Sequence, residues 1–255
     1  ARYALKRFNL RGSYSGGFRA PTLKEMYMNF YMGNIFMIYG NPDLKPESSH
    51  NFSLSAEYMK GRHNLTVTGF YNIVDDRITT AWNQALDGQV YTNMSRLQVS
   101  GMDANASGRY PCGISWRLSY AYTHEHIEKG EPMLSSTRPH AATARIAYDK
   151  EWKSYGLSVA LSGRWLSKVT TDVYTEITSY EQTERQTYPG YTMWKLSLMQ
   201  RVWRGVNVTF AVDNLFNYRP GYYYSNSPST TGTACSVGLS LNIEQMFKKK
   251  EKQRI

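Results

Sequence analysis

Apolar and small or polar residues alternate along much of this chain. From Ile114 to Thr123, Ile, Trp, Leu and Tyr occupy every second position, and Ser, Arg, Ala and Thr lie between them. The alternation recurs in Leu157–Trp165, Val206–Asp213 and Val237–Ile243. Because successive side chains of a strand point to opposite faces, this period predicts β-strands with one apolar and one polar face.

Six further segments alternate in the same sense, less regularly, which makes ten predicted strands. These six are Tyr3–Phe18, Ser48–Lys60, Arg62–Thr79, Gln89–Tyr110, Pro139–Lys150 and Tyr188–Arg204. Tight turns are predicted near Lys60–His63, Arg109–Gly113, Asp149–Tyr155 and Trp203–Val206. Between them lie longer polar connections, near Arg19–Glu47, Asp75–Gln89, Glu125–Pro139, Thr170–Tyr188 and Asn217–Thr231.

This alternation of short and long connections is typical of transmembrane barrels, which have short periplasmic turns and long extracellular loops. The sequence therefore predicts an all-β fold, a transmembrane antiparallel β-barrel to which this chain supplies about ten strands. A soluble β-sandwich or barrel is the alternative, because half-buried soluble sheets also alternate. It would bury Trp116, Leu118, Val208, Phe210, Leu239 and Leu241 inside protein, whereas the membrane barrel exposes them as an apolar band.

Two observations favour the membrane barrel. Several predicted strands exceed the usual length of about five or six residues in globular sheets. The polar face also carries five cations, which suit a wet lumen better than a core: Arg117, Arg145, Arg164, Lys195 and Arg201. They could guide an anionic ligand, or pair with acidic groups of another domain that fills the lumen.

The composition excludes some classes of protein. The net charge of +10 suggests nucleic acid, but the basic residues are scattered and no RNA-binding signature accompanies them, so we expect no nucleic-acid partner. The 21 tyrosines suit a membrane boundary, where the ring is buried and the hydroxyl stays wet. Cys112 lies in a predicted tight turn and Cys235 near the opposite end of a strand, so two free thiols are expected.

Three stretches resemble the TonB-dependent outer-membrane receptors. Phe18–Glu25 and Gly40–Glu47 are similar to the FRAP and NPDL boxes of the haem receptors in that family. Asp213–Tyr218 resembles the end of the family's penultimate strand, and the last strand ends at the aromatic Phe247. The resemblance implies a barrel of about 22 strands, with residues 1–247 as its C-terminal part and 248–255 as a basic tail.

The resemblance also implies a function and partners. The family takes up scarce nutrient complexes through the bacterial outer membrane, with no covalent chemistry. Here haem ranks first, then a ferric siderophore or cobalamin, then an oligosaccharide or peptide; no intrinsic cofactor is implied. The partners implied are an N-terminal plug with the remaining barrel strands, from the same precursor or a second chain, the TonB complex, outer-membrane lipid and a surface lipoprotein.

Between the two boxes lies a segment rich in Met and Tyr. Thioether sulfur packs adaptably on flat aromatic surfaces and is a soft ligand, and Tyr or Met can ligate haem iron. The alternative is an apolar loop or short helix packed over the lumen. Haem receptors of this type carry a His between the boxes, and this chain has none. The candidate ligand-binding residues are Met26, Tyr27, Met28, Tyr31, Met32, Met37 and Tyr39.

The histidines and serines are weaker candidates. His124 and His126 share a strand face and could bind a metal, but the phase of the strand places them on the lipid side, so no metal site is predicted. His50, His63 and His140 are expected to be satisfied surface histidines. An outer-membrane enzyme, the alternative from another class, would need a Ser–His contact of about 3 Å at one wall.

Overall fold

The computed structural model describes residues 1–33, 36–127, 137–153, 155–174, 183–221, 230–243 and 246. Within these ranges the chain is almost entirely β-structure. No helix among the described residues is long and apolar enough to cross a membrane. The elements are β1 (Arg2–Leu5), β2 (Phe8–Arg19), α1 (Leu23–Tyr27), β3 (Phe30–Met32), β4 (Phe36–Tyr39), β5 (Glu47–Lys60), β6 (His63–Asn83), η1 (Gln84–Leu86), β7 (Gly88–Arg109), β8 (Ile114–Ile127), β9 (His140–Glu151), β10 (Gly156–Leu166), β11 (Val169–Tyr174), β12 (Thr183–Tyr188), β13 (Tyr191–Trp203), β14 (Val206–Asp213) and β15 (Ala234–Leu241).

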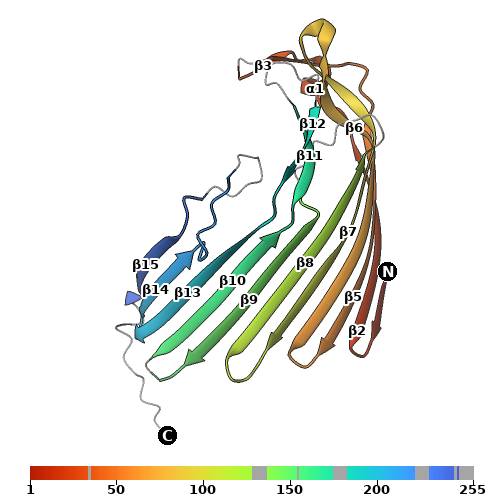
Figure 1. Ribbon diagram of the computed structural model, residues 1–255. Helices are drawn as coiled ribbons and strands as arrows, with labels where there is room; N and C mark the ends of the chain where they lie inside the picture. Colours follow the sequence, from red (N-terminus) through yellow and green to blue (C-terminus); the bar gives the residue numbers. More distant parts are fainter. Residues whose placement is uncertain are drawn as a thin grey trace.

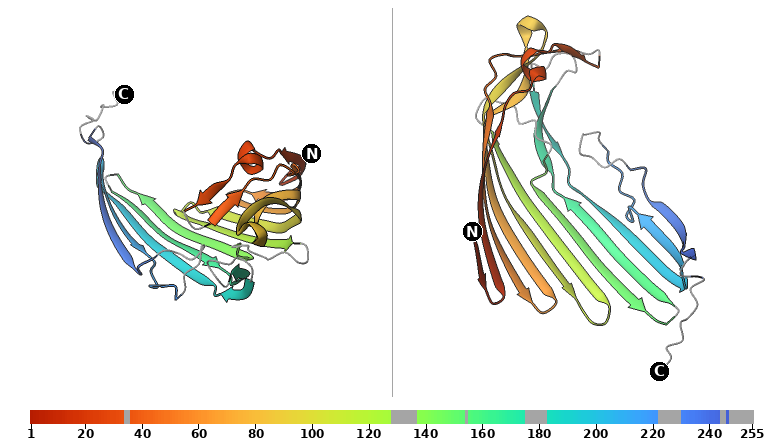
Figure 2. Two further views of the ribbon diagram at one scale, coloured as in Figure 1. Left: turned by 90° about the horizontal axis from the view of Figure 1, so that it is seen from above. Right: turned by 180° about the vertical axis from the view of Figure 1, so that it is seen from behind.

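The strands form one antiparallel meander. Its order is β1-β2-β5-β6-β7-β8-β9-β10-β13-β14-β15, so each strand pairs with the next long strand of the chain. Viewed from above, the sheet curves into an open arc (Figure 2), and the tight turns lie together at its lower end (Figure 1). The antiparallel barrel-type sheet predicted from the sequence is therefore confirmed, and each of the ten predicted segments contributes to this path.

The tight turns close at the positions that the sequence predicts. Lys60 pairs with His63, Glu151 with Gly156, and Trp203 with Val206 across them. Gly61 and Gly205 have positive φ angles of 58° and 70°. Only glycine adopts this left-handed conformation without steric cost, so these two glycines allow the chain to reverse within two residues.

Several predicted boundaries are wrong. The segment Tyr3–Phe18 is not one strand but a hairpin, because Lys6 turns the chain at a φ of 45° and Leu5 pairs with Phe8. The region Asp75–Gln89 is not a polar loop. β6 and β7 stay paired as far as Asn83 and Gly88, and only the short turn η1 connects them.

The hairpin β6–β7 continues because other parts of the chain pack against its upper end. β4 pairs with β7 in parallel, with Ile38 opposite Gln89, and Ile38 and Ile78 are both buried. The Tyr39 hydroxyl donates to the carbonyl oxygen of Leu86 at 3.2 Å.

The region 170–188, also predicted as a loop, contains the paired strands β11 and β12.

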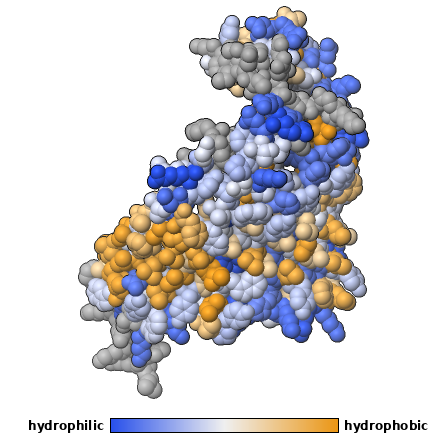
Figure 3. All heavy atoms as spheres, in the orientation of Figure 1, coloured by the Kyte–Doolittle hydropathy of each residue, from blue (hydrophilic) through white to orange (hydrophobic). Residues whose placement is uncertain are grey.

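The two faces of the sheet differ in polarity, as the alternation predicts. The registers align the apolar members of neighbouring strands, so Trp116 pairs with Ile146, Leu198 with Phe210, and Val208 with Leu239. Leu118, Phe210 and Leu239 are 50%, 38% and 66% exposed. Figure 3 shows apolar side chains gathered over the lower part of the molecule, beneath a hydrophilic upper part. The apolar band is exposed, which contradicts the soluble sandwich.

The polar face is the inner face of the arc. Ala147, Ala160 and Ala211 form one row across it and are only 4%, 3% and 6% exposed, although the face is open. Side chains converge on the concave side of a curved sheet, so small residues there are covered by their neighbours. The outer face has the opposite geometry, and its Leu and Ile side chains splay apart.

Candidate functional site

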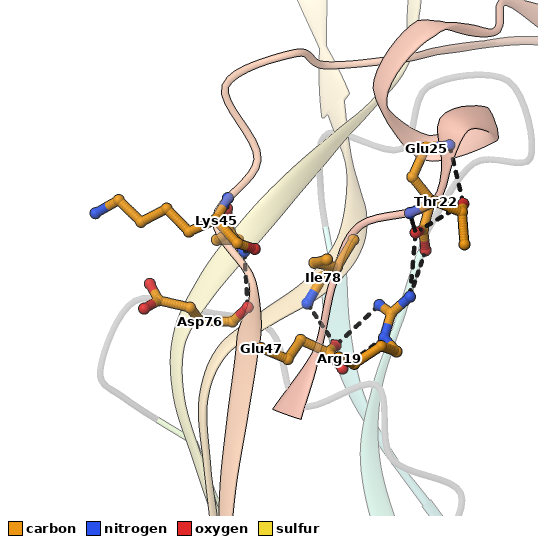
Figure 4. Close-up of polar contacts among 8 residues, drawn as sticks. Arg19, Thr22, Glu25, Lys45, Glu47, Asp76 and Ile78 are labelled. Carbon is orange, nitrogen blue, oxygen red and sulfur yellow. Dashed lines mark hydrogen bonds and ion pairs between the residues drawn. The ribbon is translucent and has the colours of Figure 1, made fainter. Parts of the chain in front are cut away.

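The long connection between β2 and β5 is fastened at its base by Arg19. The guanidinium donates to both carboxylate oxygens of Glu47, at 2.7 and 3.1 Å, and to both of Glu25, at 2.9 and 3.1 Å (Figure 4). Arg19 ends β2, Glu25 lies in α1 and Glu47 begins β5. One planar side chain therefore joins both ends of the loop to its helix, a geometry that a fork of five donors supports.

We call the cluster of Arg19, Glu25 and Glu47 the Arg19 anchor. Each of its two carboxylates accepts further hydrogen bonds. The backbone N–H of Ile78 in β6 donates to Glu47 at 2.7 Å (Figure 4). Thr22 and Glu25 form a capping box at the start of α1, in which the Thr22 N–H and hydroxyl donate to Glu25 at 2.7 and 2.9 Å. The two sequence boxes that flank the loop thus meet in space as one polar network.

The second box fixes the return of the loop to the sheet. Asn41 accepts the backbone N–H of Asp43 at 3.0 Å in a local turn and donates to the carbonyl oxygen of Tyr91 in β7 at 2.9 Å. Asn93 accepts from the Lys45 N–H at 2.8 Å and donates to the Lys45 carbonyl at 2.9 Å. Leu44 is buried. These residues therefore form a turn that is fastened to β7.

The Met and Tyr residues between the boxes divide into two groups. Tyr27, Met28, Tyr31 and Met32 are exposed, with fractions between 52% and 67%. Met26, Met37 and Tyr39 are partly buried, the last two in β4 against β7. Seen from above, the segment with α1 and β3 leans over the concave side of the sheet (Figure 2). The loop therefore combines a packed base with an exposed sulfur- and phenol-bearing tip.

Below this loop, the five predicted cations lie on the polar inner face. Lys195 pairs with Asp213 at 2.8 Å, and Arg201 with Glu151 at 3.2 Å. Arg117 and Arg145 are directly opposite each other on β8 and β9. No carboxylate among the described residues pairs with Arg117, Arg145 or Arg164. These three line a cavity of about 450 Å³ together with Lys195 and Asp213.

The histidines have aromatic partners. The Tyr14 hydroxyl lies 2.9 Å from His50 Nδ1, and the Tyr120 hydroxyl lies 2.8 Å from His140 Nδ1. His63 packs between Tyr110 and Trp116. His50 and His140 are therefore satisfied, as predicted, and His63 is exposed at the surface. His124 and His126 follow Tyr122 on the outer face, opposite Ser100 and Gln98.

The described residues lack two further kinds of site. They contain no group of three His, Cys, Asp or Glu residues that could hold a metal. In these same ranges, no serine hydroxyl is hydrogen-bonded to a histidine ring, the contact that the enzyme alternative expects. Cys112 and Cys235 are both free and exposed, as predicted.

The end of β14 is closed by Asn214, which is buried with a φ of 51°. Its amide donates to the Tyr218 carbonyl at 2.7 Å and accepts the Tyr218 N–H at 2.9 Å. The third resembling stretch is therefore also a turn that fixes a connection. The Tyr222–Tyr224 run, Phe247 and the basic tail lie outside the described residues.

The Arg19 anchor lies beyond the Tyr14–His50 pair, above the membrane-spanning part of the sheet, and it should respond to acid. Hydrogen bonds from Arg19 and then Ile78 lower the pKa of Glu47, against the opposing effect of burial. For Glu25, burial alone raises the pKa, but the hydrogen bonds from Thr22 and Arg19 outweigh it and the net pKa is lowered. A carboxyl whose pKa is lowered by folding stabilises the folded form above its ordinary value of 4.5, and this contribution is lost as the pH falls below it.

We therefore expect the loop to loosen as the pH falls below 4.5. A spin label at Leu23→Cys, with both native cysteines replaced by serine, should gain mobility over that range. A label at Leu86→Cys, on the η1 connection, serves as control and should change less. An equal gain in label mobility at both positions would mean that the whole upper region unfolds in acid, and that the Arg19 anchor is not the acid-sensitive element.

Comparison with known proteins decides the family. A model of the TonB-dependent receptor-like β-barrel matches residues 1–215. The chain belongs to this family. The membership places it in the bacterial outer membrane, as the resemblance of its sequence boxes implied, and the family is one of receptors.

Individual relatives agree with this assignment. The chain is 32% identical over 165 residues to an iron-regulated outer membrane virulence protein of Vibrio cholerae serotype O1, covering 55% of this chain and 24% of that protein. It is similar in fold to the FrpB iron transporter of Neisseria meningitidis (TM-score 0.71, 17% identity, 94% of this chain and 37% of that one). It is equally similar to the siderophore receptor PirA of Acinetobacter baumannii (TM-score 0.71, 18% identity, 94% and 39%). The chain thus spans about a quarter to two fifths of the length of these proteins.

The sequence did not reveal how the loop is held. Arg19, Glu25 and Glu47 all stand in the two boxes, but their mutual contact joins positions up to 28 residues apart. The signal that could have found it is the charge pattern itself, one arginine and two glutamates within the two boxes that flank the Met- and Tyr-rich segment. The parallel pairing of β4 with β7 has no comparable signal.

Proposed function

We infer that this chain forms part of a receptor that takes up an iron complex across the outer membrane by a TonB-dependent mechanism. The observation that carries the proposal is the exposed Met and Tyr tip of a fastened loop above a basic inner face. The matched relatives, named for iron regulation, iron transport and siderophore reception, support iron as the element transported.

Haem is the first candidate for the ligand. The phenols of Tyr27 and Tyr31 and the thioethers of Met28 and Met32 are exposed at the loop tip. Either kind of group can ligate haem iron, and thioethers pack on a porphyrin plane. The two propionates of haem carry negative charge, which the field of Arg117, Arg145 and Arg164 would attract toward the inner face. A ferric siderophore is the second candidate, since its anionic groups fit the same field.

The basic inner face supports one partner in particular, a plug domain. Arg117, Arg145 and Arg164 have no carboxylate partner among the described residues and face the interior of the arc. Carboxylates of a plug domain would satisfy them, as Asp213 satisfies Lys195 at 2.8 Å within the sheet. These arginines support the plug, and the family membership supports further barrel strands and the TonB complex on the periplasmic side as partners. We also propose delivery by a surface lipoprotein.

Ligand titration of the purified full-length receptor tests the proposal. We expect haem binding to be seen in its Soret absorption. The combined replacement Tyr27→Phe, Met28→Leu, Tyr31→Phe and Met32→Leu should weaken binding about tenfold or more, since each tenfold corresponds to about 1.4 kcal/mol of lost contact. Each replacement keeps the shape of the side chain and removes its oxygen or sulfur ligand.

A matched control keeps this result specific. Tyr3 is 63% exposed, as is Tyr27, and Met102 is 39% exposed, but both lie on the outer face of the sheet. Tyr3→Phe with Met102→Leu should leave binding unchanged. A receptor that binds ferric siderophore and ignores haem would move the assignment to the second candidate. A receptor that binds neither iron complex would contradict the proposed function.

A further inference from the structure

The tight turns bring cations from five separate places in the sequence to one rim. Neighbouring turns lie side by side because their strands are paired and because backbone hydrogen bonds join them. The Met59 N–H donates to the Arg7 carbonyl oxygen at 2.9 Å, and the Arg109 N–H donates to the Arg62 carbonyl oxygen at 3.3 Å. All the cations concerned are exposed. This tight-turn rim carries Lys6, Arg7, Lys60, Arg62, Arg109, Lys150, Lys153 and Arg204.

The sheet itself does not neutralise these cations. None of the eight forms an ion pair with a carboxylate among the described residues. The carboxylates in this part have other partners: Glu151 pairs with Arg201, Asp149 accepts the Ser158 hydroxyl at 2.5 Å, and Glu57 accepts the side-chain amides of Asn9 and Asn64. The rim is therefore a surface of positive charge that lacks an internal counterion in the described part of the chain.

Exposed aromatic rings mark the depth of this rim in the membrane. Tyr110, Trp152 and Trp203 are 45%, 47% and 55% exposed and lie within or beside the tight turns. On the outer face, the apolar band begins directly above them, with Ile114 at 40% and Leu241 at 55% exposure. Figure 3 shows this apolar region meeting hydrophilic side chains at the lower end. Amphipathic rings occupy the headgroup level of a bilayer.

We propose that the tight-turn rim binds the phosphate headgroups of anionic phospholipids in the periplasmic leaflet. The cations stand at the depth of the lipid phosphates, because the rings beside them occupy the boundary between hydrocarbon and water. Long Lys and Arg stems can extend along apolar surface while the charged end reaches a phosphate. A soluble acidic protein would need no such layer of rings next to the cations, so the lipid explains both features.

The test uses full-length receptor reconstituted in nanodiscs of phosphatidylcholine with about one fifth phosphatidylglycerol. After release into the gas phase, native mass spectrometry counts the lipids retained on the receptor. Wild type is expected to retain phosphatidylglycerol in excess of its share. Lys60→Gln with Arg62→Gln should reduce that excess about fivefold or more, since one basic residue near an anionic surface contributes about that factor.

Two controls keep the outcome decisive. Lys45→Gln with Lys168→Gln removes two exposed cations at the opposite end of the strands and should leave the excess intact. The single variant Arg204→Gln, a milder change at one turn, covers the case in which the double variant does not fold. No excess of phosphatidylglycerol in wild type, or an equal loss in the opposite-end control, would overturn the proposal. So would unchanged retention in folded rim variants, the result expected if an acidic protein is the partner.

Discussion

Replacing Phe210 with Arg is expected to destabilise the folded protein in a bilayer by about 2–4 kcal/mol, the cost of a cation on the lipid face near the midplane of a barrel. Phe210 lies in the middle of β14, between Leu198 and Val237 on the outer face. Arg at this position would place a guanidinium in hydrocarbon without a partner. The measurement is the urea midpoint of the full-length receptor in lipid vesicles.

The neighbouring residue provides the control. Thr209 is adjacent in sequence but lies on the inner face, opposite Met199 and Gly238. Thr209→Arg should therefore cost less than about 1 kcal/mol, since its side chain reaches a wet interior. Similar losses for both variants would mean that the two faces do not differ in their surroundings, and the membrane orientation derived from the registers would be wrong.

Replacing Arg19 with Ala is expected to release the loop between β2 and β5. The change removes four hydrogen bonds to two carboxylates and leaves Glu25 and Glu47, whose side chains are only 15% and 18% exposed, without their cation. A hydrogen bond to a charged group contributes about 1.5–3 kcal/mol, and partial exposure of Arg19 reduces the total, so a local loss of about 2–3 kcal/mol is expected. Hydrogen exchange of residues 20–46 should accelerate accordingly.

A second ion pair gives the comparison. Arg185 pairs with Asp172 at 3.2 Å and is 71% exposed, so Arg185→Ala should cost less than about 1 kcal/mol. Arg19→Lys should restore only part of the loss, because an ammonium keeps the charge but cannot bridge two carboxylates with a planar fork. Exchange in residues 20–46 that is unchanged by Arg19→Ala would show that β4, rather than the Arg19 anchor, holds the loop.

Sequence reasoning was least reliable where local and tertiary signals conflict. In Tyr3–Phe18 the two-residue reversal at Lys6 and Arg7 shifts the alternation by only one position, because the paired residues Leu5 and Phe8 share one face, and so short an interruption does not stand out in the pattern. Asp75, Asp76 and Asp87 gave the region Asp75–Gln89 a polar, loop-like composition. The strands nevertheless stay paired there because Ile78 is buried beneath the returning loop and Ile38 packs on the same hairpin end.

In the candidate site too, some features could be predicted from the sequence and others could not. The exposed tip residues Tyr27, Met28, Tyr31 and Met32 could be chosen from their chemistry alone. Their separation from the partly buried Met26, Met37 and Tyr39 could not, because it depends on the pairing of β4 with β7 and on the folding of the loop around α1. Likewise, the cations of the inner face were predictable one by one, but not that Lys195 and Arg201 have carboxylate partners while Arg117, Arg145 and Arg164 share a cavity.

By itself, the sequence determined the quantities that depend on a local period. These are the strands, the face each side chain takes and the tight turns between them, since side-chain direction in a strand follows residue parity. Only the tertiary structure decided what depends on residues far apart in the chain. The Arg19 anchor, the parallel pairing of β4 with β7 and the gathering of cations on the tight-turn rim each need the curvature and register of the whole sheet. No local pattern encodes these distances.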